Sequence, residues 1–202
     1  MPRLAGQIDL AKGEAILDAA VEVLGDRGLA ASMEEVARRA GVSKQTIYNH
    51  YGSKADLIRA LVERRVADMT APLETPGAGE HPEQALAGFA RVMLQAVVSP
   101  RATAMMRLYI QGAGEAPEVA RAVFEAGPKT SRARLAAFLA REHADGRLAV
   151  EDPAMAAEFF SGMVVSAHQL AELLGVHPGL TDARIDALAT EAARRFMRAY
   201  SV

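Results

Sequence analysis

The sequence predicts an all-α protein, and three observations support this fold class. Ala, Leu, Arg and Glu, which all occur readily in helices, are abundant among the 202 residues, whereas only 5% are aromatic. Runs of Val, Ile and Thr that alternate with polar residues are absent, so the pattern typical of strands is missing. Apolar residues instead recur at intervals of three and four. Half of the residues are hydrophobic, which is enough for one sizeable core or two small domains.

Four helices are expected in the N-terminal third of the chain. In chain order they cover residues 12–26, 33–40, 44–50 and 54–69. Ser32 stands three residues before Glu35, which is the spacing of a capping box at the start of the second helix. Gly41 ends the second helix and Ser43 caps the third. These signals predict three helices in close succession, followed by a longer fourth helix.

A composition change marks the expected domain boundary. Residues 70–82 contain three Pro and two Gly, which favour turns over regular structure. We therefore expect a first domain at residues 1–55, a connecting helix at residues 54–69 and a second helical domain at residues 70–202. The helices expected beyond the boundary cover residues 83–98, 101–111, 118–126, 129–145, 153–174 and 182–200.

Several classes of chemistry are disfavoured by the residues present. The chain has no Cys, which excludes disulfides and thiolate metal sites. No nucleophile elbow, His-Glu-x-x-His motif or P-loop occurs. Residues 112–117 read GAGEAP, half of a dinucleotide fingerprint, but they lack the third glycine and a preceding strand. We expect neither an enzyme nor a resident cofactor or metal.

The expected location is the cytoplasm, with no membrane partner. The N-terminal residues form no apolar run of the kind that a signal peptide needs. The longest uncharged apolar stretch lies between Glu158 and Glu172 and has 13 residues. A membrane-spanning helix needs about 20.

The charge distribution, unlike the total charge, suggests a nucleic-acid partner. The net charge is −2, so the chain as a whole gives no such signal. Between Val36 and Lys54, however, no residue is acidic and four are basic, namely Arg38, Arg39, Lys44 and Lys54. A local basic patch of this kind can contact phosphates even when the whole chain is slightly acidic.

The third predicted helix has the features of a recognition helix in a helix-turn-helix. It is too short to be stable alone, and the turn Gly41-Val42-Ser43 separates it from the second helix. Val42 and Ile47 are the apolar residues expected to anchor it. Its other faces can then present hydrogen-bonding side chains to the major groove. The alternative is a polar, solvated helix in an ordinary helical bundle.

An ordered set of residues extends over the second to fourth predicted helices. It comprises Val36-Ala37, Gly41-Val42-Ser43, Ile47-Tyr48, Tyr51, Ser53-Lys54 and Leu57. With these residues, the stretch Gly25 to Leu61 resembles the DNA-binding domain of the tetracycline-repressor (TetR) family. The resemblance covers the first quarter to third of the chain. Tyr51 departs from it, because the family usually has Phe there; we expect its hydroxyl to be tolerated where it reaches solvent or phosphate.

The resemblance implies roles in DNA binding for nine residues. The candidates for contact with base edges, or near them, are Lys44, Gln45, Thr46, Asn49 and His50. The candidates for contact with phosphates are Tyr48 and Lys54, with Ser32 and the capping residue Ser43 beside them. The implied partner is a double-stranded, palindromic DNA operator, because one short helix reads too few bases for useful specificity.

The resemblance also implies that the second domain forms a homodimer. The predicted helices that begin at Pro153 and Asp182 are the candidates for this role. On the last helix, one apolar stripe contains Ile185, Leu188, Ala192 and Phe196. The alternative is that this stripe packs within its own chain.

A small-molecule effector is the third partner that the resemblance implies. The candidate pocket residues are Met93, Met105, Met106, Tyr109, Phe124, Phe160, Met163 and His168. Met suits irregular or ligand-filled interiors, although the same pattern also occurs in an ordinary core. His168 is ionisable and lies inside the longest apolar stretch, where it is either a ligand-orienting group or a core residue. Few charged residues occur in this region, so we expect a largely apolar or aromatic effector.

Together these features predict a TetR-like transcriptional regulator, usually a repressor in this family. It would bind its operator as a homodimer and leave it when the effector binds. The alternative is a ligand-independent dimeric DNA-binding protein whose second domain only dimerises.

Overall fold

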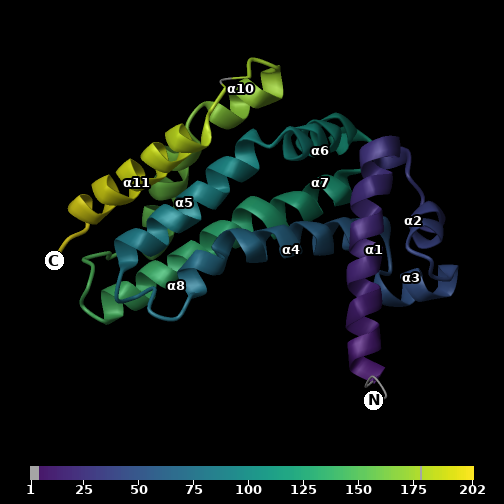
Figure 1. Ribbon diagram of the computed structural model, residues 1–202, viewed down its shortest axis with the longest axis horizontal. Helices are drawn as coiled ribbons and strands as arrows, with labels where there is room; N and C mark the ends of the chain where they lie inside the picture. Colours follow the sequence, from purple (N-terminus) through teal and green to yellow (C-terminus); the bar gives the residue numbers. More distant parts are fainter. Residues whose placement is uncertain (1–4, 178) are drawn as a thin grey trace. The chain divides into compact units, whose positions relative to one another are not determined.

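The computed structural model describes residues 5–177 and 179–202, and within these ranges the chain is helical and has no strand (Figure 1). This confirms the all-α fold class. The α-helices are α1 (Ala5–Arg27), α2 (Met33–Arg39), α3 (Lys44–His50), α4 (Lys54–Glu74), α5 (Pro82–Val98), α6 (Pro100–Gln111), α7 (Pro117–Phe124), α8 (Thr130–Ala144), α9 (Pro153–Val165), α10 (His168–Leu174) and α11 (Asp182–Ala199). Short helical turns η1 (Gly28–Ala30), η2 (Gly112–Gly114) and η3 (Glu125–Lys129) connect some of them. Among the described residues, no helix has both the length and the apolar character needed to cross a membrane.

The chain packs as two compact units. The first contains residues 1–64 and 104–126, and the second contains residues 65–103 and 127–202. Packing therefore groups the end of α6 and all of α7 with the N-terminal helices, although the sequence placed them in the second domain. The boundary expected near residue 70 was meant to separate a DNA-binding domain from a domain for effector binding and dimerisation. The two packing units do not test this division of functions, so it stays a prediction.

The core of the first unit joins α1 to α4 with residues from α6 and α7. Its buried members include Ile16, Leu24, Val36, Ile47, Ile58, Tyr109, Val119 and Val123. At one point in this unit two turns approach closely: a Cβ added to Gly112 of η2 would lie 2.3 Å from Cδ1 of Leu29 in η1. The glycine that begins the sequence GAGEAP thus packs directly under the end of the Leu29 side chain, which would have to shift to admit a Cβ.

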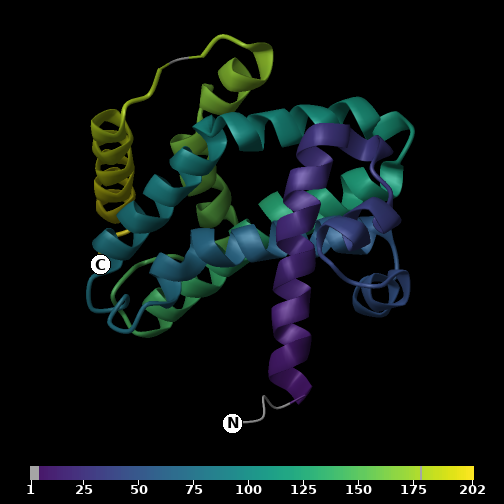
Figure 2. The ribbon, with the colours of Figure 1, turned by 45° about the vertical axis from the view of Figure 1, so that its right-hand side comes forward.

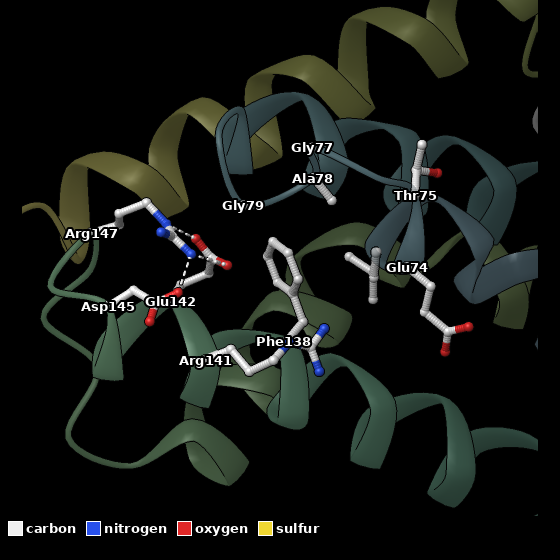
Figure 3. A pocket seen from close by; sticks show the side chains of 11 residues that line it. Glu74, Thr75, Gly77, Ala78, Gly79, Phe138, Arg141, Glu142, Asp145 and Arg147 are labelled. Atoms are coloured by element: carbon white, nitrogen blue, oxygen red, sulfur yellow. Dashed lines mark hydrogen bonds and ion pairs between the residues drawn. The ribbon is translucent and has the colours of Figure 1, made fainter.

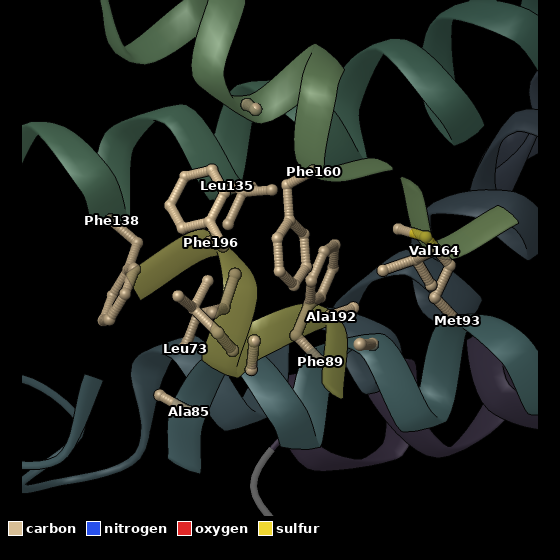
Figure 4. Packing of buried hydrophobic residues seen from close by; sticks show 14 of the residues in the cluster. Leu73, Ala85, Phe89, Met93, Leu135, Phe138, Phe160, Val164, Ala192 and Phe196 are labelled. Atoms are coloured by element: carbon tan, nitrogen blue, oxygen red, sulfur yellow. The ribbon is translucent and has the colours of Figure 1, made fainter. Parts of the chain in front are cut away.

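The core of the second unit is built by α5, α8, α9 and α11 (Figure 2 shows these helices from a second direction). The Phe89 and Phe160 ring centroids lie 6.2 Å apart in a stacked arrangement. Phe196 contacts Phe160 edge-to-face at 5.1 Å (Figure 4). Such aromatic pairs stabilise by about 0.5–1.5 kcal/mol beyond the burial of their area.

This packing corrects the expectation for the last helix. Ile185, Ala192 and Phe196 are buried in the second-unit core, and Leu188 packs against it. The stripe faces α5, alongside which α11 runs (Figure 1). Ile185, Ala192 and Phe196 thus pack within their own chain, which was the alternative to a dimer surface. Leu188 is only partly buried, and a place for it in a dimer stays a prediction.

Helix α4 extends five residues further than the sequence predicted, and it includes Pro72. Pro cannot donate a backbone hydrogen bond, so it was expected to favour a turn. One turn before the end of the helix, the buried Thr70 donates a side-chain hydrogen bond from Oγ1 to the carbonyl of Val66 at 2.9 Å. A Cβ added to Gly88 of α5 would lie 3.0 Å from Cβ of Pro72, so the two helices pack closely at this point.

The helix expected at residues 153–174 is interrupted. α9 ends at Val165, and Ser166 has φ +46° and ψ −135°, a conformation that favours glycine. α10 begins at His168. The sequence between them contains neither Gly nor Pro, so no local signal predicted the break.

Candidate nucleic-acid interface

Capping interactions fix both short helices of the helix-turn-helix. At the start of α2, the Glu35 amide donates to Ser32 Oγ at 3.2 Å and the Ser32 amide donates to Glu35 Oε2 at 2.8 Å. This confirms the predicted capping box. At the start of α3, the Thr46 amide donates to Ser43 Oγ at 3.0 Å. Ser32 and Ser43 thus fix the starts of α2 and α3.

The turn between the two helices depends on Gly41. Its φ is +67°, in the left-handed region, and the Val42 amide donates to the carbonyl of Ala37 at 3.0 Å. This geometry ends α2 and redirects the chain. Val42 then packs against the first-unit core and Ile47 is completely buried in it, as expected for the anchors of α3.

The end of α3 contacts α1. Tyr51, just after the helix, donates from its hydroxyl to the carbonyl of Gly13 at 3.4 Å. Burial raises the pKa of this phenol. The hydroxyl, which we expected to be tolerated where it reaches solvent or phosphate, bonds to α1. His50 is half-buried, and a Cβ on Gly13 would lie 3.8 Å from its Nδ1.

Four candidates form one exposed face of α3. Lys44, Gln45, Tyr48 and Asn49 are exposed, at positions that recur every four residues. Gln45 Nε2 donates to Asn49 Oδ1 at 2.7 Å, so the two amide groups are held together. Thr46 is half-buried, and its hydroxyl lies 2.8 Å from that of Ser43. The structure thus brings together four of the six candidates on this helix and turns Thr46 and His50 partly inward.

Lys54 has a structural contact within the first unit. Its Nζ donates to the carbonyl of Leu29 in η1 at 2.7 Å, and the residue is half-buried. This bond links the start of α4 to the turn between α1 and α2. A phosphate contact by Lys54 stays a prediction, and it would compete with this bond.

The sequence analysis missed one residue of this surface, Glu34. Its Oε1 lies 2.6 Å from Lys44 Nζ, and the Tyr48 hydroxyl donates to the same oxygen at 3.5 Å. The hydrogen bond from Lys44 keeps the pKa of Glu34 below its usual value, and Glu34 in turn raises the pKa of Lys44. The stretch considered as free of carboxylates began at Val36, two residues later. A helix-turn-helix places the start of α2 beside the start of α3. This geometry could have predicted from the sequence that Glu34 lies near Lys44.

The eight candidate pocket residues are divided between the two units and differ in burial. Met93 and Phe160 belong to the buried core of the second unit, whereas Tyr109 is buried in the first-unit core and Met105 packs against that core. Phe124 is 55% exposed and Met163 is 42% exposed. Met106 and His168 are half-buried. A role for these residues around an effector stays a prediction.

Two hollows in the second unit are lined by other residues. One, of about 270 Å³, lies between the end of α4 and the end of α8 (Figure 3). In it the buried carboxylate of Glu142 accepts from Arg147 at 2.6 and 3.0 Å, and Arg147 also contacts Asp145 at 2.5 Å. The other, of about 470 Å³, is an open groove lined by residues of α5 and α11 together with the loop before α5. Among the described residues, no group of three or more His, Asp or Glu is placed to bind a metal.

Family models match both parts of this chain. A model described as "Bacterial regulatory proteins, tetR family" matches residues 16–61, which contain the whole helix-turn-helix. A second, described as "AefR-like transcriptional repressor, C-terminal domain", matches residues 84–202, more than half of the chain. The chain belongs to the TetR family. The TetR family consists of transcriptional regulators that bind DNA, and not of enzymes.

Two solved structures match almost the whole chain. A TetR-family regulator from Mesorhizobium loti MAFF303099 is 26% identical with a TM-score of 0.77, and the match covers 96% of this chain and 98% of that one. The flavonoid-responsive regulator FrrA is 30% identical with a TM-score of 0.71, covering 95% and 97%.

Curated relatives match over shorter stretches. The regulator BetI of Rhizobium meliloti is 32% identical over 127 residues, which are 60% of this chain and 60% of BetI. The activator FasR of Mycolicibacterium smegmatis is 49% identical over 55 residues, 27% of this chain and 25% of FasR. The chain thus spans between a quarter and three fifths of these two proteins. Repression, ligand binding and homodimerisation are typical of the TetR family.

Proposed function

We propose that this TetR-family protein binds a palindromic DNA operator as a homodimer and represses transcription. The observation that supports this best is the exposed face of α3, where Lys44, Gln45, Tyr48 and Asn49 lie together on a helix anchored by the buried Ile47. Such a helix fits the major groove, and amide side chains can pair with adenine edges. Repression is the role named in the description of the matching C-terminal domain.

Selection of bound sequences from a random duplex pool tests DNA binding and symmetry together. We expect a palindrome whose half-sites are about one helical turn apart or a multiple of it. Operators with single base changes then separate the roles of the side chains. Asn49→Ala should relax the preference at one base pair, by about 1–3 kcal/mol, whereas Tyr48→Ala should weaken all sites alike. If the Asn49 variant keeps the full base preference, its assignment to base contact is wrong.

For the dimer we propose the exposed face of α9 in place of the buried stripe of α11. Met155, Phe159 and Met163 follow one another at intervals of four residues and are 51%, 60% and 42% exposed. Exposed apolar side chains in such a row are typical of a protein interface. We expect Phe159→Glu to give monomers in light scattering, because a charge would be buried in the interface. The matched control is Ile110→Glu, since Ile110 is equally exposed in the first unit. If both variants stay dimeric, another surface forms the dimer.

The proposed effector is a largely apolar or aromatic small molecule, and flavonoids are a first class to test because the relative FrrA is described as flavonoid-responsive. Its binding would favour a dimer whose recognition helices no longer match the operator spacing. α4 extends from Lys54 in the first unit to Glu74 in the second, so it is the proposed transmitter. A coupling of about 1–3 kcal/mol would lower operator affinity about 5- to 150-fold.

A ligand-independent regulator is the second candidate, and the packing of the second unit favours it. Met93 and Phe160, two of the pocket candidates, belong to its buried hydrophobic core. Calorimetric titration of the protein with a panel of flavonoids and other aromatic compounds separates the two. Binding that also weakens the operator complex supports an effector; no binding by any compound supports the second candidate.

A further inference from the structure

The start of the DNA-facing surface holds a carboxylate that the capping of α2 does not use. Glu35 completes the capping box with Ser32. Glu34, the residue before it, instead reaches across to α3, where Lys44 Nζ lies 2.6 Å from its Oε1. The Tyr48 hydroxyl donates to the same oxygen at 3.5 Å. Lys44 Nζ also lies 5.7 Å from the centre of the Tyr48 ring, so the three side chains form one group. We call Glu34, Lys44 and Tyr48 the α2–α3 seam.

The seam presents the donors that a DNA phosphate would need. An ammonium group and a phenol hydroxyl that converge on one oxygen suit a phosphate oxygen as well as a carboxylate oxygen. The amides of Gln45 and Asn49 lie on the neighbouring strip of α3 and suit base edges better. In a helix-turn-helix the first helix of the motif crosses the DNA backbone, which places phosphates next to the start of α2.

We propose that Glu34 occupies the place of a DNA phosphate on Lys44 and Tyr48 in the free protein, and so acts as a built-in competitor of backbone contacts. The proposal rests on the DNA-binding function proposed above. A phosphate that enters the seam must take Lys44 from Glu34 and then lies beside a negative carboxylate. Because every duplex has phosphates, this competition lowers affinity for all DNA sequences alike. Base contacts then decide where the protein stays.

The seam is open to solvent, so the expected effect is moderate. The side chains of Lys44 and Glu34 are 68% and 41% exposed, and water and salt screen such a pair. Glu34→Gln removes the charge and keeps the shape. We expect it to raise affinity for both operator and unrelated DNA about two- to fivefold per recognition helix. Because Lys44 would then fully neutralise one more phosphate, log K against log salt should become steeper by about 0.9 per helix, or about two per dimer.

The matched control is Glu191→Gln, which changes the net charge equally. Glu191 lies in the second unit on α11 and bonds to Arg194 and Arg195 of its own helix. The Glu191→Gln variant should bind operator and unrelated DNA with the same affinities and the same salt slope as the unchanged protein. A second variant, Lys44→Gln, tests whether Glu34 acts through Lys44. In its presence Glu34→Gln should give a clearly smaller gain, because the carboxylate then has no lysine to occupy and only its repulsion of the phosphate is removed.

Each outcome of this experiment decides something. Tighter binding of unrelated DNA with a steeper salt slope supports the proposal. Weaker binding by Glu34→Gln would instead show that Glu34 positions Lys44 for DNA, which overturns it. A gain confined to the operator, with an unchanged salt slope, would place Lys44 at a base edge and also overturn it. If the unchanged protein binds no duplex at low salt, the proposed function fails first, and this failure is distinct from that of the Glu34 variant.

Discussion

Ile47 is the side chain on which the position of α3 depends, and Ile47→Ala is the sharpest test of that dependence. Ile47 has no exposed surface and packs with residues of α1, α2 and α4. Helix α3 has only seven residues, and a helix of this length is not stable without tertiary contacts. Removing its main anchor should therefore release α3 before the rest of the first unit unfolds.

The expected cost follows from the buried atoms. The change to Ala removes three carbons, worth about 0.8 kcal/mol each, or about 2.4 kcal/mol in all. A residual cavity adds to this, and buried Ile→Ala changes cost about 2–5 kcal/mol in general. We expect about 3 kcal/mol here. Ile47→Val removes one carbon and should cost about 1 kcal/mol.

Hydrogen exchange measures the release of α3 directly. The Tyr51 amide donates to the carbonyl of Ile47 at 2.8 Å and reports on the last turn of the helix. A loss of about 3 kcal/mol should speed its exchange by about two orders of magnitude, and operator affinity should fall in parallel. Ile110→Ala is the matched control, since Ile110 is 56% exposed in the same unit and should change stability by less than about 0.5 kcal/mol. If Ile47→Ala leaves both the Tyr51 amide and operator binding unchanged, α3 is held by other contacts and our reasoning is refuted.

Three further changes test other parts of the fold. Gly41→Ala should lower the free energy of unfolding, measured by chemical denaturation, by about 1–2 kcal/mol, because φ is +67° and no atom of another residue crowds the site. Gly41→Asn should lower it by less, and equal losses would contradict this backbone explanation. Ser166→Gly should stabilise by about 1 kcal/mol, whereas Ser166→Ala should give no gain in the same measurement. Arg194 and Arg195 lower the pKa of Glu191 to about 2 from an ordinary 4.5, so its contribution to stability is present above about pH 4.5 and is lost as pH falls through 2. The melting temperature of Glu191→Gln should accordingly lie below that of the unchanged protein at pH 6 and meet it near pH 2, and a difference that grows in acid would refute this.

Local signals allowed the helix-turn-helix to be predicted from the sequence. The bounds of α3, residues 44–50, agree with the expected ones. The side chain of Ser43 caps this helix, and the positive φ of Gly41 ends the helix before it. The same holds for the capping box of Ser32 with Glu35. Each of these signals acts within about four residues, so the chain itself contains the information.

The errors concern contacts between helices that are distant in the chain. A stripe such as Ile185, Ala192 and Phe196 has the same spacing whether it faces α5 of its own chain or a second copy. Met and aromatic residues likewise occur at the same intervals in a core and around a ligand. Glu34 was missed because its partner Lys44 lies ten residues away, across a turn. Periodicity indicates which face of a helix is apolar, and it does not indicate what that face meets.

The break between α9 and α10 shows how distant contacts overrule a local preference. The residues Val165 to His168 contain no helix breaker, so a continuous helix was the local optimum. Ser166 instead adopts a positive φ, at a cost of about 1–3 kcal/mol. Contacts of α10 offset this cost: α10 packs on α5, and the buried carboxylate of Glu172 lies 2.8 Å from His177 Nδ1. The gain expected for Ser166→Gly therefore measures the strain at Ser166 that those contacts sustain.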